Sequence, residues 1–300
     1  MVVDTACSSG VVAMNVAVQA LRAGEIEAAV VGAVSLLASG EVHTGFQQRG
    51  ILSAAAEFHV FDGRADGIVP GEGCGLVLLK TLEQAQRDGD RIHAVLTAIA
   101  VNNNGRTAGP TAPSFQAQQE LLRTALARSG RRPEEISYIE TNGSGAEVTD
   151  VLELKTIESV YRTGTTQSCA LGSIKPNIGH PMTAEGIASF IKVVLMLQHR
   201  QRVPLLSASE SMAHYDLAAS PFALDRELVS WPGEHLAAGV NCFADGGTNV
   251  HLIVESWEGT GSVRPPAEPV EPAEPVAAES ADRNRQPVLV GQPSIWEEYR

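Results

Sequence analysis

The chain has 300 residues, of which 44% are hydrophobic and 19% charged, and its formal net charge is −13 at pH 7. This balance is typical of a globular protein with a sizeable core, and the acidic charge argues against nucleic acids and anionic membranes as partners. No apolar stretch reaches the roughly 18 residues of a membrane span, and no secretion signal is recognisable, so we expect a cytoplasmic protein.

The apolar pattern predicts alternating helices and strands up to residue 258. In chain order they are a helix over residues 9–22, strands over 28–34, 76–79 and 94–101, a helix over 116–127, a strand over 136–140, a long apolar helix over 181–198 and a closing strand over 252–255. Such alternation is typical of layered α/β folds. Residues 1–5 resemble the end of a buried strand, which predicts that further strands belong before them.

The composition changes after Glu258. Seven of the sixteen prolines lie between Gly259 and Arg300, in runs mixed with alanine and glutamate. Such a segment buries too little apolar surface to offset the entropy lost on ordering. We therefore predict a domain over residues 1–258, a linker over 259–285, and a tail over 286–300 in which apolar residues return.

Of the four cysteines, Cys7 has the surroundings of a nucleophile. It lies between a predicted strand and the start of a helix and is flanked by small residues. The unpaired N–H groups at a helix start favour a thiolate, lower its pKa and can hold an oxyanion. Cys74, Cys169 and Cys242 are expected to be inert and buried. Because the four are widely spaced, neither a metal site nor a disulfide framework is expected.

The segment VDTACSSG around Cys7 resembles the active-site motif of ketosynthases, the condensing domains of polyketide and fatty-acid synthases. Further segments resemble motifs of the same family in the same order: FDGRADGIVPGEG over 61–73, NGRT and TAP over 104–113, GSIKPNIGH over 172–180 and GVNCFADGGTN over 239–249. The chain is thereby identified as a member of the beta-ketoacyl synthase family from Met1 to about Glu255.

The resemblance implies a thiolase-type fold, with two related α/β halves layered α-β-α-β-α and usually dimeric. Because family domains have much more chain before the cysteine motif, the front part of the N-terminal half is expected to be absent from this sequence. The implied chemistry is transfer of an acyl chain from the phosphopantetheine of an acyl carrier protein to Cys7. No bound cofactor and no metal are expected.

His180 is the expected chemical partner of Cys7. It precedes Pro181 at a predicted helix start, where a neutral imidazole is favoured. The resemblance implies that His180 assists decarboxylation of a malonyl unit and stabilises the enolate, and that Lys175 supports the site electrostatically. It also implies contacts to substrate from Ser144, Phe243, Asp245, Gly246 and Thr248.

The main departure from the family pattern is at Asn142. The family motif is E-x-H-G-T-G, with a second catalytic histidine, whereas this chain has asparagine there and Ser144 in place of a threonine. Asparagine forms hydrogen bonds but cannot carry a proton. Losing one general acid or base typically costs about 10²–10⁴ in rate. Loading of Cys7 is therefore expected to survive and decarboxylative condensation to be impaired, as in non-elongating ketosynthases of modular polyketide synthases.

Two alternative functions stay open at the level of sequence. The chain could be a condensation-competent enzyme that tolerates Asn142, or an inactive fragment or scaffold that needs a complementing chain.

Asp245 stands where the family usually has phenylalanine beside the acyl pocket. Its carboxylate indicates either a more polar substrate chain or a solvated loop residue, while its backbone N–H can still belong to an oxyanion hole.

Overall fold

The computed structural model describes residues 1–55, 57–109, 111–161 and 169–259. The chain divides into two units, Met1–Ser262 and Val263–Arg300. The second unit lies outside the described residues, as do the predicted tail and all of the predicted linker except Gly259. The division into domain, linker and tail therefore stays a prediction.

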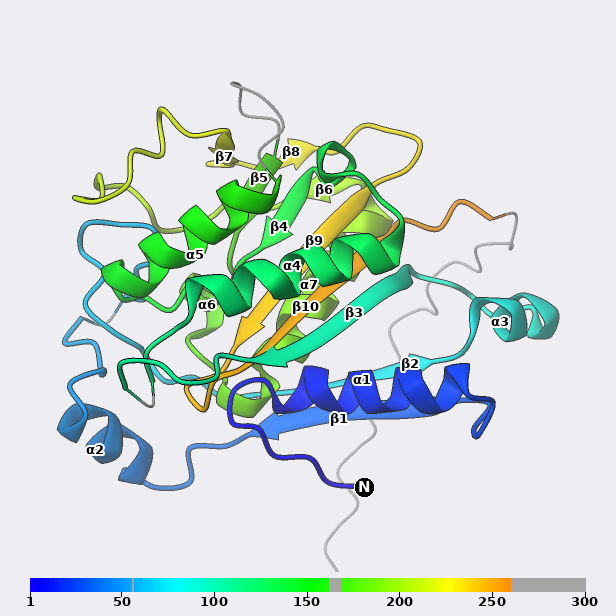
Figure 1. Cartoon of the computed structure of the whole chain (residues 1–300), viewed down its shortest axis with the longest axis horizontal. Helices are drawn as coiled ribbons and strands as arrows, with labels where there is room; N and C mark the ends of the chain where they lie inside the picture. The colour runs from blue at the N-terminus through cyan, green and yellow to red at the C-terminus, as the bar shows by residue number, and fades with distance from the viewer. Residues whose placement is uncertain (56, 110, 162–168, 260–300) are drawn as a thin grey trace, which may run out of the picture. The chain divides into compact units, whose positions relative to one another are not determined.

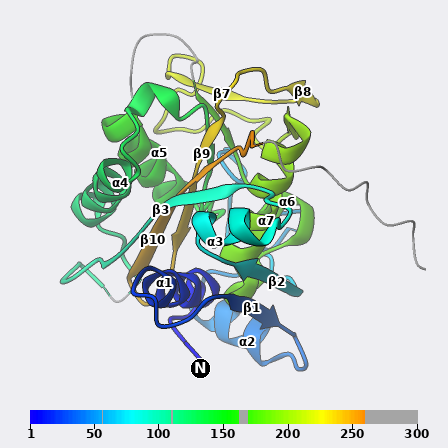
Figure 2. The same ribbon diagram turned by 90° about the vertical axis from the view of Figure 1, so that its right-hand side faces the viewer.

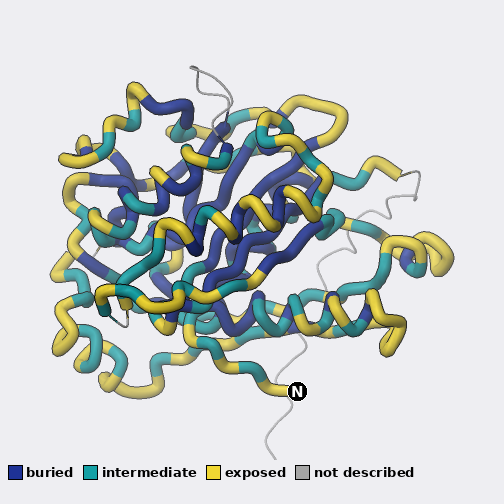
Figure 3. Tube along the Cα trace, viewed as in Figure 1, coloured by how far each residue is buried: buried dark blue, intermediate teal, exposed yellow. Residues whose placement is uncertain are grey.

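A six-stranded mixed sheet forms the centre of the first unit (Figure 1). Its strands lie in the order β3 (Val95–Asn103), β10 (Thr248–Glu255), β9 (Ala237–Phe243), β4 (Tyr138–Glu140), β5 (Cys169–Gly172) and β7 (Phe222–Leu224). Strand β10 is antiparallel to both of its neighbours, whereas β9, β4, β5 and β7 are mutually parallel. Helices cover both faces, and the inner strands are correspondingly apolar and buried along most of their length (Figure 3).

Two pairs of helices cover the sheet, α4 (Phe115–Ser129) with α5 (Glu147–Tyr161) on one face and α1 (Ser9–Arg22) with α7 (Glu185–His199) on the other (Figures 1 and 2). Strand pleating separates the two cores, because Ile253 belongs to the α4–α5 cluster and its neighbour Leu252 to the α1–α7 cluster. The ends of α4 follow from local chemistry. Ser114 accepts a hydrogen bond from the Ala117 N–H, and Gly130 adopts the left-handed conformation that ends the helix.

A two-stranded antiparallel sheet lies on the far side of α1 and α7. It consists of β1 (Ala29–Ser35) and β2 (Gly73–Leu79), and the described layers therefore follow the order α-β-α-β. The predicted thiolase-like α/β layering is confirmed. The set α1, β1 and β2 also resembles the set α7, β9 and β10, since in each a helix precedes an antiparallel strand pair, with other elements inserted along the chain.

The two central helices approach closely at reciprocal glycines. A β-carbon on Gly186 of α7 would lie 2.5 Å from Val11 Cγ1, and one on Gly10 of α1 would lie 2.7 Å from Ile187 Cγ1. Each glycine thus accommodates the aliphatic residue that follows the other glycine. This contact brings the N-terminal ends of α1 and α7 together, and with them the residues that precede each helix, Cys7 and His180.

Helix α5 and strands β5, β7 and β9 were not predicted from the sequence. Neither were the remaining elements. They are α2 (Glu41–Gln48), α3 (Leu82–Asp88), α6 (Lys175–Ile178), the short strands β6 (Gln201–Arg202) and β8 (Val229–Ser230), and two 3-10 turns at Pro133–Glu135 and Met182–Ala184. None of the helices in the described part of the chain is long and apolar enough to cross a membrane.

Two predictions about chain segments are wrong. The helix predicted over 181–198 becomes α-helical only at Glu185, after the 3-10 turn. Residues 1–5 form no strand, and the side chains of Met1 and Val2 are exposed. A strand needs a hydrogen-bonded neighbour, and no described strand lies beside these residues.

Candidate active site

Cys7 lies in a tight turn immediately before α1. Ala6 has φ +57°, a left-handed conformation that costs energy for a residue with a side chain. Ser9 holds the turn, because its hydroxyl accepts a hydrogen bond from the Thr5 N–H at 2.9 Å and donates one to the Ala6 carbonyl. The turn brings the Cys7 sulfur, a ring nitrogen of His180 and a carboxylate oxygen of Glu185 within 4.8 Å of one another.

His180 is held through its backbone by the segment that contains the GEG motif. Its N–H donates to the Val69 carbonyl at 2.8 Å, and its own carbonyl accepts the Gly71 N–H at 2.9 Å. A β-carbon on Gly71 would lie 2.3 Å from the Ile178 carbonyl oxygen, so the close approach requires glycine. Burial and the nearby Lys175 ammonium hold the pKa of His180 well below its usual range. The predicted neutral imidazole is confirmed, although the cause differs from the helix start proposed from sequence.

Lys175 and Glu185 form a buried ion pair behind His180. The Lys175 Nζ lies 2.7 Å from Glu185 Oε1, and both side chains are at most 2% exposed. Burial lowers the pKa of Lys175, but the Glu185 carboxylate outweighs this effect, and the net pKa is raised. The sequence analysis missed Glu185. An acidic residue in the first turn of a helix, five residues after His180, was the signal that could have identified it.

Asn142 is held by hydrogen bonds to its side-chain oxygen, its backbone carbonyl and its backbone N–H. Its side-chain Oδ1 accepts the Phe243 N–H at 2.9 Å, and its carbonyl accepts Lys175 Nζ at 2.6 Å. Its own N–H donates to Glu153 at 2.7 Å. The carbonyl of Asn142 and the carboxylate of Glu185 therefore share the same ammonium group, which places Asn142 in the cluster around Cys7.

A buried polar chain supports Asn142 from behind. Glu153 accepts the N–H groups of Asn142 and Gly143 and the Asn241 side-chain amide. Asn241 in turn contacts His251, whose other ring nitrogen contacts the Tyr161 hydroxyl. Burial raises the pKa of Glu153 to about 7 and lowers that of His251 to about 3. The shape of the Asn142 turn thus depends on groups from α5, β9 and β10.

The five residues expected to contact substrate lie in two places. Phe243 ends β9 and Thr248 begins β10, and Asp245 and Gly246 lie in the turn between them. There Asp245 hydrogen-bonds the Cys7 sulfur through its backbone N–H. The Asp245 carboxylate pairs with Arg49, a residue that the sequence analysis missed, at 2.8 Å. Ser144 lies elsewhere, because its hydroxyl and N–H both donate to Asp150 of α5.

The electrostatics of Cys7 correct the sequence interpretation. Burial, reinforced by the Glu185 carboxylate, raises the pKa of the Cys7 thiol to about 12. The predicted thiolate stabilised by a helix start is therefore wrong, because desolvation outweighs both the helix end and the Lys175 charge. The prediction that the other three cysteines are buried holds for only two of them. Cys169 and Cys242 are buried as predicted, whereas Cys74 is exposed on β2.

The raised pKa of Cys7 predicts its reactivity. We expect the rate of Cys7 alkylation by iodoacetamide to keep rising, about tenfold per pH unit, from pH 7 to beyond pH 10, because only the thiolate reacts. The rate for a small free thiol, with a pKa of about 8.5, should level off above about pH 9. Peptide mass spectrometry measures the modification at Cys7, and Cys7→Ser supplies the blank. If the alkylation rate stopped rising below pH 8, the helix start and not burial would determine the pKa of the Cys7 thiol.

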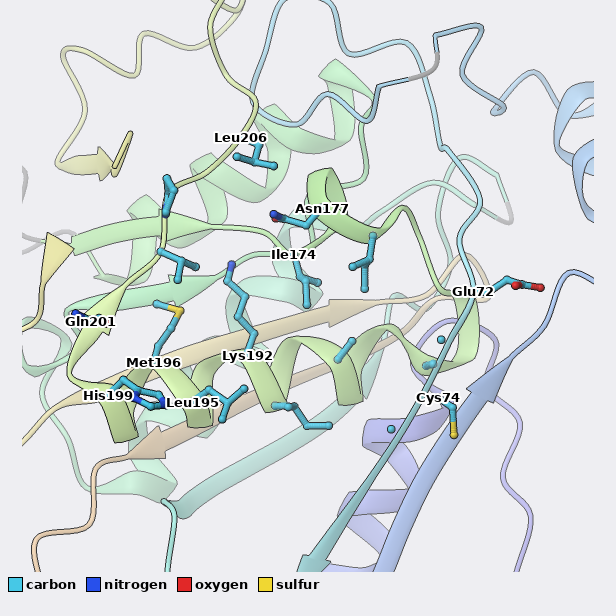
Figure 4. Close-up of a pocket in the computed structure, with 18 residues that line it drawn as sticks. Glu72, Cys74, Ile174, Asn177, Lys192, Leu195, Met196, His199, Gln201 and Leu206 are labelled. Atoms are coloured by element: carbon cyan, nitrogen blue, oxygen red, sulfur yellow. The ribbon is translucent and has the colours of Figure 1, made fainter. Parts of the chain in front are cut away.

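An apolar pocket of about 690 Å³ lies along the side of α7 that carries Ala188, Ile191 and Leu195 (Figure 4). Its lining includes Ile174 and side chains from β2, α6 and α7, but neither Cys7 nor His180. Glu72 and Lys192 are charged residues of this lining, and Lys192 forms an ion pair with the buried Glu140 at 2.7 Å. On the neighbouring sheet, Val30 and Val34 of β1 and Leu76 and Leu78 of β2 are 56–70% exposed. These apolar surfaces lie outside the Cys7 cluster.

Comparisons with known proteins agree with the motifs. Residues 1–85 match the family model described as the N-terminal domain of beta-ketoacyl synthase, and residues 93–209 match the one described as its C-terminal domain. Polyketide synthase PksL of Bacillus subtilis (strain 168) is 53% identical over 290 residues, which are 97% of this chain but 6% of that protein.

Solved structures give the same picture. The ketosynthase from module 6 of the bacillaene synthase of Bacillus subtilis 168 is 38% identical with a TM-score of 0.83 over 85% of this chain and 47% of its own. The oxazolomycin ketosynthase domain OzmH KS8 of Streptomyces albus JA3453 is 49% identical with a TM-score of 0.77 over 87% of this chain and 66% of its own. The chain thus spans about half to two thirds of these solved domains.

Proposed function

The chain belongs to the beta-ketoacyl synthase family, and on this premise we propose that it transfers an acyl chain from carrier-protein phosphopantetheine to Cys7. The observation that carries the proposal is the convergence of Cys7, His180 and the Lys175–Glu185 pair at the ends of α1 and α7. The phosphopantetheine enters as part of the substrate. An acyl carrier protein is the proposed partner, and a homodimer the proposed assembly of a complete domain.

The acyl transfer follows from the protonation states. Cys7 is a thiol at neutral pH and His180 is a neutral imidazole, so His180 can accept the thiol proton as the sulfur attacks the thioester carbonyl. The Asp245 N–H, which already faces the sulfur, is placed to stabilise the oxyanion. When the thioester C–S bond breaks, the departing phosphopantetheine thiolate takes the proton from His180. The step leaves an acylated Cys7 and a free carrier thiol.

We further propose that decarboxylative condensation is impaired. The observation that supports this proposal is Asn142, which stands where the family motif has a second histidine. Its Oδ1 accepts the Phe243 N–H. The amide preserves a hydrogen-bonded turn but offers no group that can titrate. Loading and extension should therefore separate, so that an acyl chain is received on Cys7 and passed on without a new carbon–carbon bond.

Intact-protein mass spectrometry tests the loading step. After incubation with an acyl-carrier protein, we expect wild type and Cys74→Ser to gain one acyl mass and Cys7→Ala to gain none. Cys74→Ser is the matched control because it removes an exposed thiol on β2. With malonyl-carrier protein added, the release of CO₂ should stay near the level seen with Cys7→Ala. No acyl gain in folded wild type would refute loading, and efficient product formation would favour the condensation-competent alternative.

A second candidate function, a scaffold that needs a complementing chain, is favoured by the exposed apolar surfaces. The outer face of β1–β2 presents Val30, Val34, Leu76 and Leu78, and the pocket along α7 adds a further apolar surface (Figure 4). Surfaces of this kind usually bind another protein segment. In the same mass-spectrometry experiment, acyl gain only after a complementing ketosynthase segment is added would favour this candidate.

A further inference from the structure

The Cys7 cluster contains three different metal-ligating groups. The Cys7 sulfur, a ring nitrogen of His180 and a carboxylate oxygen of Glu185 lie within 4.8 Å of one another, and in the described part of the chain no other trio of such side chains does so. Thiolate, imidazole and carboxylate are the usual ligands of zinc. Cys7 is distant in the sequence from His180 and Glu185, and the three meet only because α1 and α7 pack together.

The spacing of His180 and Glu185 fits a shared ion better than a hydrogen bond. Nδ1 of His180 lies 3.4 Å from Oε2 of Glu185, and neither atom has a hydrogen-bond partner among the described residues although both are buried. An N–H···O hydrogen bond is normally about 2.9 Å long. Two ligand atoms on one tetrahedral zinc, with bonds of about 2.0–2.2 Å, are about 3.4 Å apart.

The sulfur is close enough to complete the site. A sulfur and a nitrogen on one tetrahedral zinc are about 3.6 Å apart. Because the sulfur lies no more than 4.8 Å from a ring nitrogen of His180 and a carboxylate oxygen of Glu185, a rotation of the Cys7 side chain that closes about 1.2 Å brings it to the spacing of two ligands on one zinc. The thiol ligand selects Zn²⁺ over Mg²⁺, which prefers an all-oxygen site.

The charges around the cluster are compatible with a cation. Lys175 contacts Oε1 of Glu185 and leaves Oε2 for a metal, so the carboxylate can bridge an ammonium group and an ion. A neutral imidazole has a lone pair available on one ring nitrogen, which is what a metal ion requires of His180. One thiolate and one carboxylate offset the two charges of zinc, and Lys175 limits the affinity by adding a positive charge nearby.

We infer that Cys7, His180 and Glu185 bind Zn²⁺ and that the bound ion reversibly blocks the Cys7 thiol. Binding forms the Zn–S bond and releases the thiol proton to solvent, with no change in oxidation state. A fourth position is left for water or an anion. The blocking of acyl loading rests on the proposed function, whereas the binding of zinc does not.

Cobalt binding tests the site without any acyl donor. Co²⁺ is added to reduced, chelator-treated protein, and the absorbance of the thiolate-to-cobalt charge transfer is followed. We expect one Co²⁺ per chain, displaced by Zn²⁺. Cys7→Ser should lose the charge-transfer absorbance, and Glu185→Asp should bind at least tenfold more weakly because its shorter side chain withdraws one ligand. Cys74→Ser, the control, should bind as wild type does.

The inference fails if wild type shows no charge-transfer absorbance, or if Cys7→Ser retains it. Circular dichroism verifies that each variant is folded, and His180→Gln supplies a second ligand deletion, with the same loss of affinity expected, if Glu185→Asp unfolds. Acyl loading is measured separately with a chelator present. Acyl loading without cobalt binding would contradict only the zinc site. Cobalt binding without acyl loading would contradict only the proposed function.

Discussion

Replacement of Asn142 by histidine is expected to raise the rate of malonyl decarboxylation by about 10²–10⁴-fold, the usual contribution of one general acid or base. The site is prepared for an imidazole, because the Phe243 N–H that now donates to Asn142 Oδ1 can donate to Nδ1 of a histidine. That bond would fix the tautomer and leave Nε2–H directed away from Phe243. The Asn142 carbonyl, held by Lys175, need not move.

The measurement is CO₂ release from malonyl-carrier protein by protein already acylated on Cys7. Asn142→Gln is the matched control, since it lengthens the side chain but adds no titratable group, and it should give no increase. Acyl loading should be similar in wild type and Asn142→His, since this half-reaction depends on Cys7 and His180. If the histidine variant loads normally and still releases no CO₂, Asn142 is not the cause of impaired condensation.

Replacement of Lys175 by methionine is expected to lower the free energy of unfolding by about 3–5 kcal/mol, because it leaves the Glu185 carboxylate buried without a counter-charge. Both groups are at most 2% exposed, and burial already raises the pKa of Glu185 despite the nearby ammonium. The Asn142 carbonyl would lose its donor as well. Urea unfolding followed by circular dichroism measures the change.

A double variant separates the ion pair from simple packing. Lys175→Met with Glu185→Leu removes both charges together and should recover much of the loss, since an apolar pair of similar volume can replace a buried ion pair. Arg87→Met, which breaks an exposed ion pair with Glu83 on α3, is the control and should change stability little. If the single Lys175 variant is no less stable than Arg87→Met, the pair does not hold the site together.

Local patterns identified much of the fold and most of the site. Helix α1 lies at the residues predicted, and β1, β3, α4 and β4 differ from prediction by at most two residues at each end. Apolar periodicity and capping residues act within one or two turns of the chain, so a single segment carries the information. The motifs likewise placed Cys7, His180, Lys175 and Asn142, which the structure brings into one cluster.

What the amino-acid pattern could not reveal depends on groups distant in the chain. The pKa of Cys7 reflects burial under α7 and the charges of Glu185, Lys175 and Asp245, and it reversed the effect expected from the start of α1. In the sequence, Glu185 looks like an ordinary acidic residue in a first helical turn, and only the fold shows that it is buried beside Lys175. Helix starts and glycines are properties of short segments, whereas desolvation and Coulomb energy depend on which segments fold together. Local sequence therefore identified the reacting residues, and only the packing of α1 against α7 decided their protonation states.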